Sequence, residues 1–278
     1  MRTDMVTLKE IKEKDLLRLL IDELNFFDEF CTNNELKYFL FYGSLLGAIR
    51  HGGFIPWDDD IDIVMFRNDF ECLLKKFDNS GRYRLLSIEN NKDYNLPLAK
   101  VIDSTTLLVQ DYGRKEPVEL GVYLDIFILD NAPGDKYERE RFLKKAIKYT
   151  TSWGRASLKF HSSNSSFVKS VLRRIIYWPI YIKGQRYFLN KADTLARFYN
   201  DQETGIVANV SYALELNDWY YKEDFEMMRV KFEGDYEFMI PSGYERILSM
   251  YYGDWKTLPP LEERTPKHRF KAYWRGTV

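Results

Sequence analysis

Apolar residues recur at two spacings along the first half of the chain, and together they predict a mixture of helices and strands. Between Leu16 and Cys31 they fall three and four positions apart, the spacing of one face of an amphipathic helix. Residues 68–77 predict a second helix, with Asn68 as its N-cap. Six short apolar runs, each bounded by turn-forming residues, predict strands over residues 37–41, 60–65, 83–88, 98–102, 106–110 and 121–129.

The second half of the chain has a different pattern. From Asp135 onward the spacing favours helices, whereas residues 206–240 contain short strands and turns. No internal repeat, low-complexity tract or linker separates the two halves. We therefore predict one α+β domain over residues 1–278. Its mixed β-sheet core, flanked by helices, lies in residues 1–134, and residues 135–278 form a mostly helical half.

One polar stretch interrupts the apolar runs, YGSLLGAIRHGGFIPWDDDIDIVMF at residues 42–66. Gly43 and Ser44 follow a predicted strand, and Ser44 is placed to cap the helix that comes next. A strand, a tight turn and a helix N-terminus direct backbone N–H groups to one point, so we expect Gly43 and Ser44 to bind a phosphate. Arg50 and His51 lie between this turn and the acids that follow, where they would contact phosphate or hold the loop by a salt bridge.

The stretch closes with four aspartates, Asp58, Asp59, Asp60 and Asp62, that run into an apolar strand. Isoleucines alternate with the last two acids, so a strand would place Asp60 and Asp62 on one face. Two carboxylates about 4 Å apart repel by roughly 4 kcal/mol at an effective dielectric of 20. A cation would remove this cost, and hard oxygen ligands suit Mg²⁺ or Mn²⁺. The alternative is a solvated acidic turn.

A further aspartate, Asp125, stands alone in an apolar run, GVYLDIFIL at residues 121–129. Apolar residues at both parities are typical of a strand covered on both faces. A carboxylate buried there is costly unless it is paired or bound to a metal. A structural aspartate with satisfied hydrogen bonds is the alternative. A glycine-serine turn, an aspartate pair on one strand and a lone aspartate on a later strand are together typical of nucleotidyltransferase-type catalytic domains.

Four segments also carry a resemblance to a known family. They are GSLLGAIRHGGFIPWDDDIDI (43–63), LPLAKVID (96–103), GVYLDIFILD (121–130) and YGDWKTLPP (252–260), the last followed by Arg264 and His268. Because they fall in the expected order over roughly residues 15–270, the chain closely resembles the LicD family, the phosphotransferases related to fukutin and fukutin-related protein. The resemblance implies a nucleotidyltransferase-like fold. It also implies Mg²⁺-dependent transfer of a phospho-alcohol from a CDP-activated donor to a sugar, with release of CMP. In bacteria the usual donor is CDP-choline, and the acceptor is a cell-surface glycan or a teichoic acid precursor.

The resemblance and the acidic pattern together give the aspartates their expected roles. Asp60 and Asp62 would hold Mg²⁺, with Asp58 as a further ligand, and the metal would hold the donor diphosphate. Asp125 would accept the proton of the attacking sugar hydroxyl or complete the metal site, and the sequence leaves both roles open. A positioned general base contributes about 10²–10⁴-fold to a rate.

The other family-like segments add weaker candidates for substrate binding. The resemblance places Lys100 and Asp103 beside the donor site, where Lys100 would contact the donor phosphate. An exposed lysine on an edge strand is the alternative. Arg264 and His268 would belong to a tail that folds back on the site, against the alternative of an exposed tail. The spacing of the three histidines matches no zinc motif.

Composition excludes several classes of protein. The chain has 278 residues, of which 45% are hydrophobic and 30% charged, as in a globular protein with a full core. A net charge of −1 argues against a general nucleic-acid binder. Two cysteines, Cys31 and Cys72, lie in helical apolar contexts and favour reduced thiols. The N-terminus lacks the apolar core of a signal peptide, and the longest apolar run (175–182) is too short to span a bilayer, so we expect a cytoplasmic protein.

Charge is distributed unevenly along this nearly neutral chain. Residues 131–200 contain 15 Lys and Arg but only 4 Asp and Glu. Within them, residues 167–188 mix basic side chains with many apolar ones, a blend that would rest on the inner surface of a membrane carrying a lipid-linked glycan. The alternative is a basic face that balances acidic segments elsewhere.

Aromatic residues make up 16% of the chain, enough to supply a cage for the quaternary ammonium of choline. The sequence does not decide which of them would form it; the candidates are Trp57, Tyr112, Tyr123, Trp153, Trp219, Tyr220, Trp255 and Trp274. Two other functions stay open. One is a nucleotidyltransferase that moves a nucleotide to a protein or a small alcohol, and the other is a non-catalytic module that binds a glycan or choline.

Overall fold

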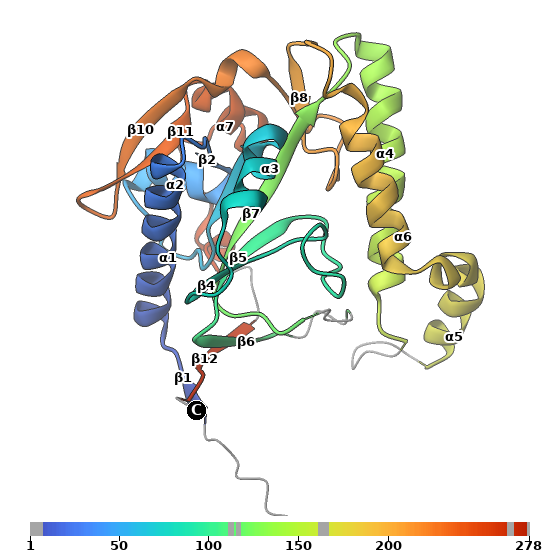
Figure 1. The fold of residues 1–278 in the computed structure, drawn as a ribbon, viewed down its shortest axis with the longest axis horizontal. Helices are drawn as coiled ribbons and strands as arrows, with labels where there is room; N and C mark the ends of the chain where they lie inside the picture. The colour runs from blue at the N-terminus through green and yellow to red at the C-terminus, as the bar shows by residue number, and fades with distance from the viewer. Residues whose placement is uncertain (1–7, 111–113, 115–117, 161–166, 266–269, 277–278) are drawn as a thin grey trace, which may run out of the picture.

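A computed structural model describes residues 8–110, 114, 118–160, 167–265 and 270–276 of the chain. It confirms the predicted α+β class (Figure 1). The helices are α1 (Glu13–Asn33), α2 (Tyr42–His51), α3 (Arg67–Lys76), α4 (Lys136–Ser157), α5 (Phe167–Ile176), α6 (Trp178–Ala196) and α7 (Tyr244–Tyr252). Short 3₁₀ helices are η1 (Arg197–Tyr199), η2 (Lys222–Phe225) and η3 (Leu261–Glu263).

Strands occur in both halves of the chain. They are β1 (Lys9–Glu10), β2 (Phe39–Leu40), β3 (Asp62–Phe66), β4 (Tyr83–Leu86), β5 (Ala99–Asp103), β6 (Thr106–Gln110), β7 (Tyr123–Asn131), β8 (Ile206–Ala208), β9 (Trp219–Tyr221), β10 (Met227–Phe232), β11 (Tyr236–Pro241) and β12 (Phe270–Trp274). The strands expected within residues 206–240 are thus confirmed, and β10 and β11 pair as a hairpin.

The central sheet has β7 in its middle. Its strand order is β2-β3-β7-β5-β4, with β8 and β9 joined to the carboxyl end of β7. Only β3 and β7 run parallel, and the other neighbours in this sheet are antiparallel. All but the last residue of β7 are buried, as expected for a strand covered on both faces. A separate small sheet joins β1, β12 and β6.

Two layers of helices flank the sheet, and they come from different halves of the chain. Helix α1 packs Leu20, Leu24 and Phe27, all fully or almost fully buried, against the main core. Helices α4 and α6 pack against each other on the opposite side of the view in Figure 1, and a second apolar cluster around Phe142 and Leu143 joins them to β8. Among the described residues no helix has the length and apolar character needed to cross a membrane.

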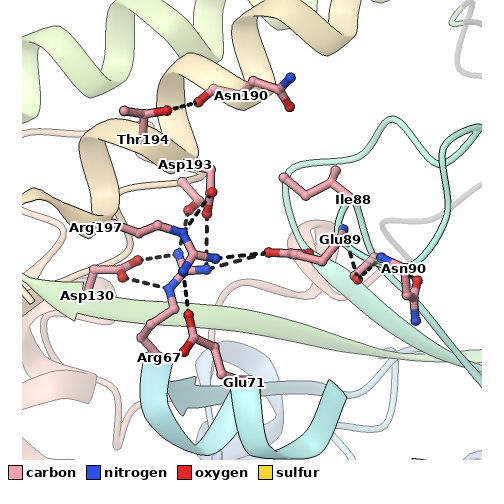
Figure 2. Close-up of polar contacts among 12 residues, drawn as sticks. Arg67, Glu71, Ile88, Glu89, Asn90, Asp130, Asn190, Asp193, Thr194 and Arg197 are labelled. Atoms are coloured by element: carbon pink, nitrogen blue, oxygen red, sulfur yellow. Dashed lines mark hydrogen bonds and ion pairs between the residues drawn. The ribbon is translucent and has the colours of Figure 1, made fainter. Parts of the chain in front are cut away.

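A buried ionic network ties the sheet to α3 and α6 (Figure 2). Arg67 on α3 donates two hydrogen bonds of 2.8 Å to the carboxylate of Asp130 on β7. The same guanidinium lies 3.1 Å from Asp193 on α6, and Arg197 donates to Asp193 at 2.9 Å. Arg67 and Asp130 are almost fully buried, so removing one partner would leave an uncompensated charge inside the protein.

Two expected helix starts are wrong by a few residues. Helix α2 begins at Tyr42, whose φ of +43° lies in the left-handed region, and the extended residue before it is Phe41. Ser44 is therefore inside the first turn and is not the N-cap. Helix α3 begins at Arg67, so Asn68 does not cap it. In both places the helix begins within two residues of the end of the preceding strand. Tertiary packing therefore overrides the local capping signal.

Candidate active site

The loop between α2 and β3 folds back over the start of α2. Helix α2 ends at His51, and Gly52 caps it with a φ of +67°, in the left-handed region that glycine adopts without strain. The turn that follows brings Asp58 against Gly43, where a β-carbon would lie 2.6 Å from Asp58 Oδ2. Gly43 is thus needed for the close approach of a carboxylate. Ser44 Oγ accepts a 2.9 Å hydrogen bond from the N–H of Asp62 and so fixes the start of β3.

Acidic side chains from this loop and from two strands gather at one place. The carboxylates of Asp58, Asp59 and Asp60 each offer an oxygen atom, and these atoms all lie within 4.8 Å of one another. Asp62 is the first residue of β3 and stands directly beside Asp125 in the parallel register, while Asp60 precedes the strand. The convergence of Asp62 and Asp125 follows from two adjacent parallel strands, which the sequence alone did not pair.

Burial and the neighbouring acids change the titration of Asp62. Loss of solvent raises its pKa well above the usual value, and repulsion from Asp60, Asp125 and Asp58 raises it further. Lys100 opposes these effects but is the smallest contributor. An ionised Asp62 in this place therefore calls for additional positive charge.

Lys100 neutralises the other central acid. It lies opposite Asp125 in the antiparallel pairing of β5 and β7, and its Nζ donates a hydrogen bond to Asp125 Oδ1. Its Nζ also stands 3.3 Å from the centroid of the Tyr123 ring. Both Lys100 and Asp125 are buried, so this contact orients the carboxylate of Asp125.

A cavity of about 1050 Å³ opens over the acids. Asp58, Asp60, Asp62 and Asp125 line one side of it, and residues 252–265 supply much of the other. This volume is slightly above the usual range for small-molecule sites, which is about 300–1000 Å³. The structure therefore brings Asp58, Asp60, Asp62 and Asp125 together beside a cavity large enough for a small molecule.

Two arginines hold the second wall of the cavity. Arg50 donates from Nη1 to the carbonyl oxygen of Trp255 at 2.9 Å, and burial lowers its pKa. Arg264 donates from Nε to the Pro259 carbonyl at 2.9 Å, and its guanidinium lies 5.6 Å from the centroid of the Trp57 ring. The segment after α7 thus folds back on the site, and Glu263 and Thr265 line the cavity whereas Arg264 between them does not. His268 lies outside the described residues.

Aromatic side chains line the cavity next to the acids. Phe127 follows Asp125 by two positions on β7 and so shares its face of the sheet. Its ring stacks on Tyr212 at 6.1 Å and meets Tyr42 edge-on at 5.0 Å. Tyr252 also lines the cavity, and burial together with the nearby acids raises its pKa. Phe127 shares its parity with Asp125, and Tyr42 and Tyr252 begin two stretches that the sequence singles out, whereas Tyr212 lies in no such stretch.

The cage candidates divide between the cavity and other places. Trp57 and Trp255 line the cavity. Lys100 covers Tyr123, and Arg139 lies 4.0 Å from the ring centroid of Trp219. Three more candidates in the described part of the chain do not line the cavity: Trp153, Tyr220 and Trp274. Tyr112 lies outside the described residues.

Two other residues expected at the site have structural partners. Asp103 accepts a 2.7 Å hydrogen bond from Arg82 and bonds to both the N–H and the hydroxyl of Thr105, so it organises the turn after β5. His51 accepts a 3.0 Å hydrogen bond from Arg50 Nε, and its pKa is lowered by burial and by that arginine. Asp103 belongs to the opposite face of β5 from Lys100, which explains why the two do not act together.

Comparisons with known proteins show similarity to one family. Residues 35–153 match the family model described as LicD/FKTN/FKRP, nucleotidyltransferase domain. The chain is 30% identical over 270 residues to the lipopolysaccharide cholinephosphotransferase LicD of Haemophilus influenzae, which covers 95% of this chain and 97% of that protein. It is also 53% identical over 34 residues to the human ribitol 5-phosphate transferase FKRP, covering 12% of this chain and 7% of that protein.

Proposed function

This chain belongs to the LicD family, and from that premise we propose that it is a phosphotransferase acting on a cell-surface glycan. It takes phosphocholine, or a related phospho-alcohol, from a CDP-activated donor and releases CMP. One observation carries the proposal: Asp60 and Asp62 line one cavity of sufficient size together with Asp125, which is distant from them in the sequence. The similarity to a cholinephosphotransferase over nearly the full length of both chains supports phosphocholine as the group transferred.

The acidic cluster fits a divalent cation. Asp58, Asp60 and Asp62 offer hard oxygen ligands. Burial first, and then the neighbouring acids, raise the pKa of Asp62, and a bound cation would favour its ionised form. We assign these three residues as Mg²⁺ ligands, and Mn²⁺ would also fit them. Asp125 stands beside these three residues, where it would complete the metal site. A bound cation would neutralise the donor diphosphate and the charge that develops on the leaving CMP.

The reaction is an in-line displacement at phosphorus. The acceptor hydroxyl oxygen forms a bond to the phosphorus of the phospho-alcohol, and the bond from that phosphorus to the bridging oxygen breaks. CMP leaves with the electron pair of that bond. Asp125, oriented by Lys100, receives the hydroxyl proton. Gly43 and Ser44 act by placing Asp58 and Asp62, in addition to their proposed contact with phosphate.

The aromatic side of the cavity suits a choline head group. A quaternary ammonium binds best against aromatic faces, and Phe127, Tyr212 and Tyr42 form a continuous aromatic wall beside Asp125. Ribitol or glycerol would instead require polar partners for their hydroxyl groups. We therefore place choline ahead of these alcohols as the donor head group.

The test is a comparison of CDP-choline, CDP-glycerol and CDP-ribitol with Mg²⁺ and a glycan acceptor, scoring CMP release. We expect CDP-choline to be used best, Asp62→Asn to abolish release, and Asp125→Asn to lower the rate by about 10²–10⁴-fold. Asp201→Asn is the matched control, because Asp201 is exposed and lies outside both the acidic cluster and the cavity lining. Near-parental rates in Asp62→Asn would overturn the assignment of the site.

A further inference from the structure

Helix α5 has its apolar face turned outward. Of its ten residues only Ser170 is buried, whereas Phe167, Val168, Leu172, Ile175 and Ile176 have between 53% and 65% of their surface exposed. The apolar positions follow the spacing i, i+1, i+4, i+5, i+8 and i+9, so they cover one continuous side of the helix. An amphipathic helix in a globular protein normally buries its apolar side. The exposure of that side here indicates a surface that binds another molecule.

The apolar surface continues into the next helix. Trp178 and Ile182 at the start of α6 are 58% and 70% exposed. We call residues 167–183 the α5–α6 corner. In Figure 1 this corner lies at the far end of the α4–α6 pair, away from the central sheet. Arg173 anchors it by donating to the carbonyl oxygens of Lys159 at 3.0 Å and Phe160 at 3.1 Å.

Basic side chains surround the exposed apolar ones. Lys169, Arg174 and Lys183 are exposed on the corner itself. Next to it, a groove of about 370 Å³ between α4 and α6 is lined by Lys148, Arg155 and Lys183 together with apolar side chains. Within this groove and corner the charged lining residues are all positive. The surface therefore combines an apolar face with a site for an anionic phosphate.

We infer that the α5–α6 corner docks on a lipid bilayer that contains anionic lipids. The apolar side of α5, with Trp178 and Ile182, enters the boundary between head groups and acyl chains. The groove between α4 and α6 receives a lipid phosphate. A second copy of the chain fits this surface less well, because the basic residues that flank the apolar side would face each other across such a contact. The docking rests on the surface alone and holds whether or not the proposed activity is correct.

The experiment is co-sedimentation of the full chain with vesicles of phosphatidylcholine alone or of phosphatidylcholine with phosphatidylglycerol. We expect binding to the phosphatidylglycerol vesicles and weaker binding as salt is raised. Ile176→Asp should lower the partition coefficient by about tenfold or more, the effect of losing one buried apolar side chain. Lys183→Glu should lower it by about fivefold or more on the anionic vesicles only.

Matched controls separate docking from general effects of substitution. Leu214→Asp places the same charge at a residue that is 59% exposed elsewhere, and Lys231→Glu reverses an exposed lysine on β10. Both should bind vesicles like the parent. CMP release with a water-soluble acceptor should be unchanged in Ile176→Asp, because the corner is outside the cavity lining. Absence of parental binding to the anionic vesicles, equal losses in the controls, or a parental dimer that Ile176→Asp dissociates would each overturn the inference.

Discussion

Replacing Asp62 by asparagine should make the metal-free protein more stable while it abolishes transfer. Asp62 and Asp125 stand side by side on adjacent strands, which are about 4.8 Å apart in a sheet. Two charges about 5 Å apart repel by roughly 3 kcal/mol at an effective dielectric of 20. Lys100 offsets part of this repulsion, whereas Asp60 and Asp58 add to it. We expect a net gain of about 1–3 kcal/mol, or roughly 2 to 10 °C in Tm.

A matched substitution elsewhere should have the opposite sign. Asp130 is also a buried aspartate on the central sheet, but Arg67 pairs with it through two hydrogen bonds of 2.8 Å. Asp130→Asn leaves the buried guanidinium of Arg67 partly uncompensated and should cost roughly 3 kcal/mol. That is the low end for such a loss, because Asp193 and Glu89 still contact Arg67.

The assay is thermal unfolding of the parent and both variants at pH 8, in EDTA and then in excess Mg²⁺. Mg²⁺ should raise the Tm of the parent by binding the folded state, and should raise that of Asp62→Asn far less. Asp130→Asn should keep the Mg²⁺ response of the parent at a lower Tm. A loss of stability for Asp62→Asn in EDTA, or an equal Mg²⁺ response in all three proteins, would refute the idea of a strained acidic cluster.

Three further predictions concern single side chains. Gly43→Ala should raise the Mg²⁺ concentration needed for half-maximal activity, because its β-carbon would displace Asp58; an unchanged Mg²⁺ titration would contradict this. Glu23 is fully buried with no hydrogen-bond partner among the described residues for either carboxylate oxygen, and burial raises its pKa. Its ionisation therefore destabilises the fold above the unfolded pKa of about 4.3, so Glu23→Gln should stabilise the protein by about 1–3 kcal/mol at pH 8 and by almost nothing at pH 4 in urea unfolding. The opposite trend with pH would rule this out. Arg50→Gln should raise the KM for donor with little change in Tm, because it releases the Trp255 segment from α2; an unaltered KM would show that the segment does not depend on this contact.

Local patterns in the sequence were sufficient for much of the fold. The continuous apolar run around Asp125 predicted a strand covered on both faces, and β7 is that strand. The alternation after Asp60 predicted a strand that ends the acidic loop, and β3 begins at Asp62. Both strands can be predicted because the pattern that indicates them involves only residues a few positions apart along the chain.

Long-range arrangement could not be obtained in the same way. The Arg67–Asp130–Asp193 network joins residues that are distant in sequence, and nothing near Arg67 indicates its partners. The start of α2 depends on a left-handed Tyr42, a conformation that local preference assigns to the glycine beside it. The second cavity wall is likewise held by a contact from Arg50 to Trp255 across most of the chain. Such features follow from packing between elements rather than from the order of residues.

The most direct test of the central claim is the mass of the acceptor after incubation with CDP-choline and Mg²⁺. If Asp60, Asp62 and Asp125 promote attack on the phosphorus of the phospho-alcohol, the acceptor gains one phosphocholine for each CMP released, and Asp62→Asn gives neither product. An acceptor that gains a cytidine nucleotide, or CMP released without any gain in acceptor mass, would contradict the account.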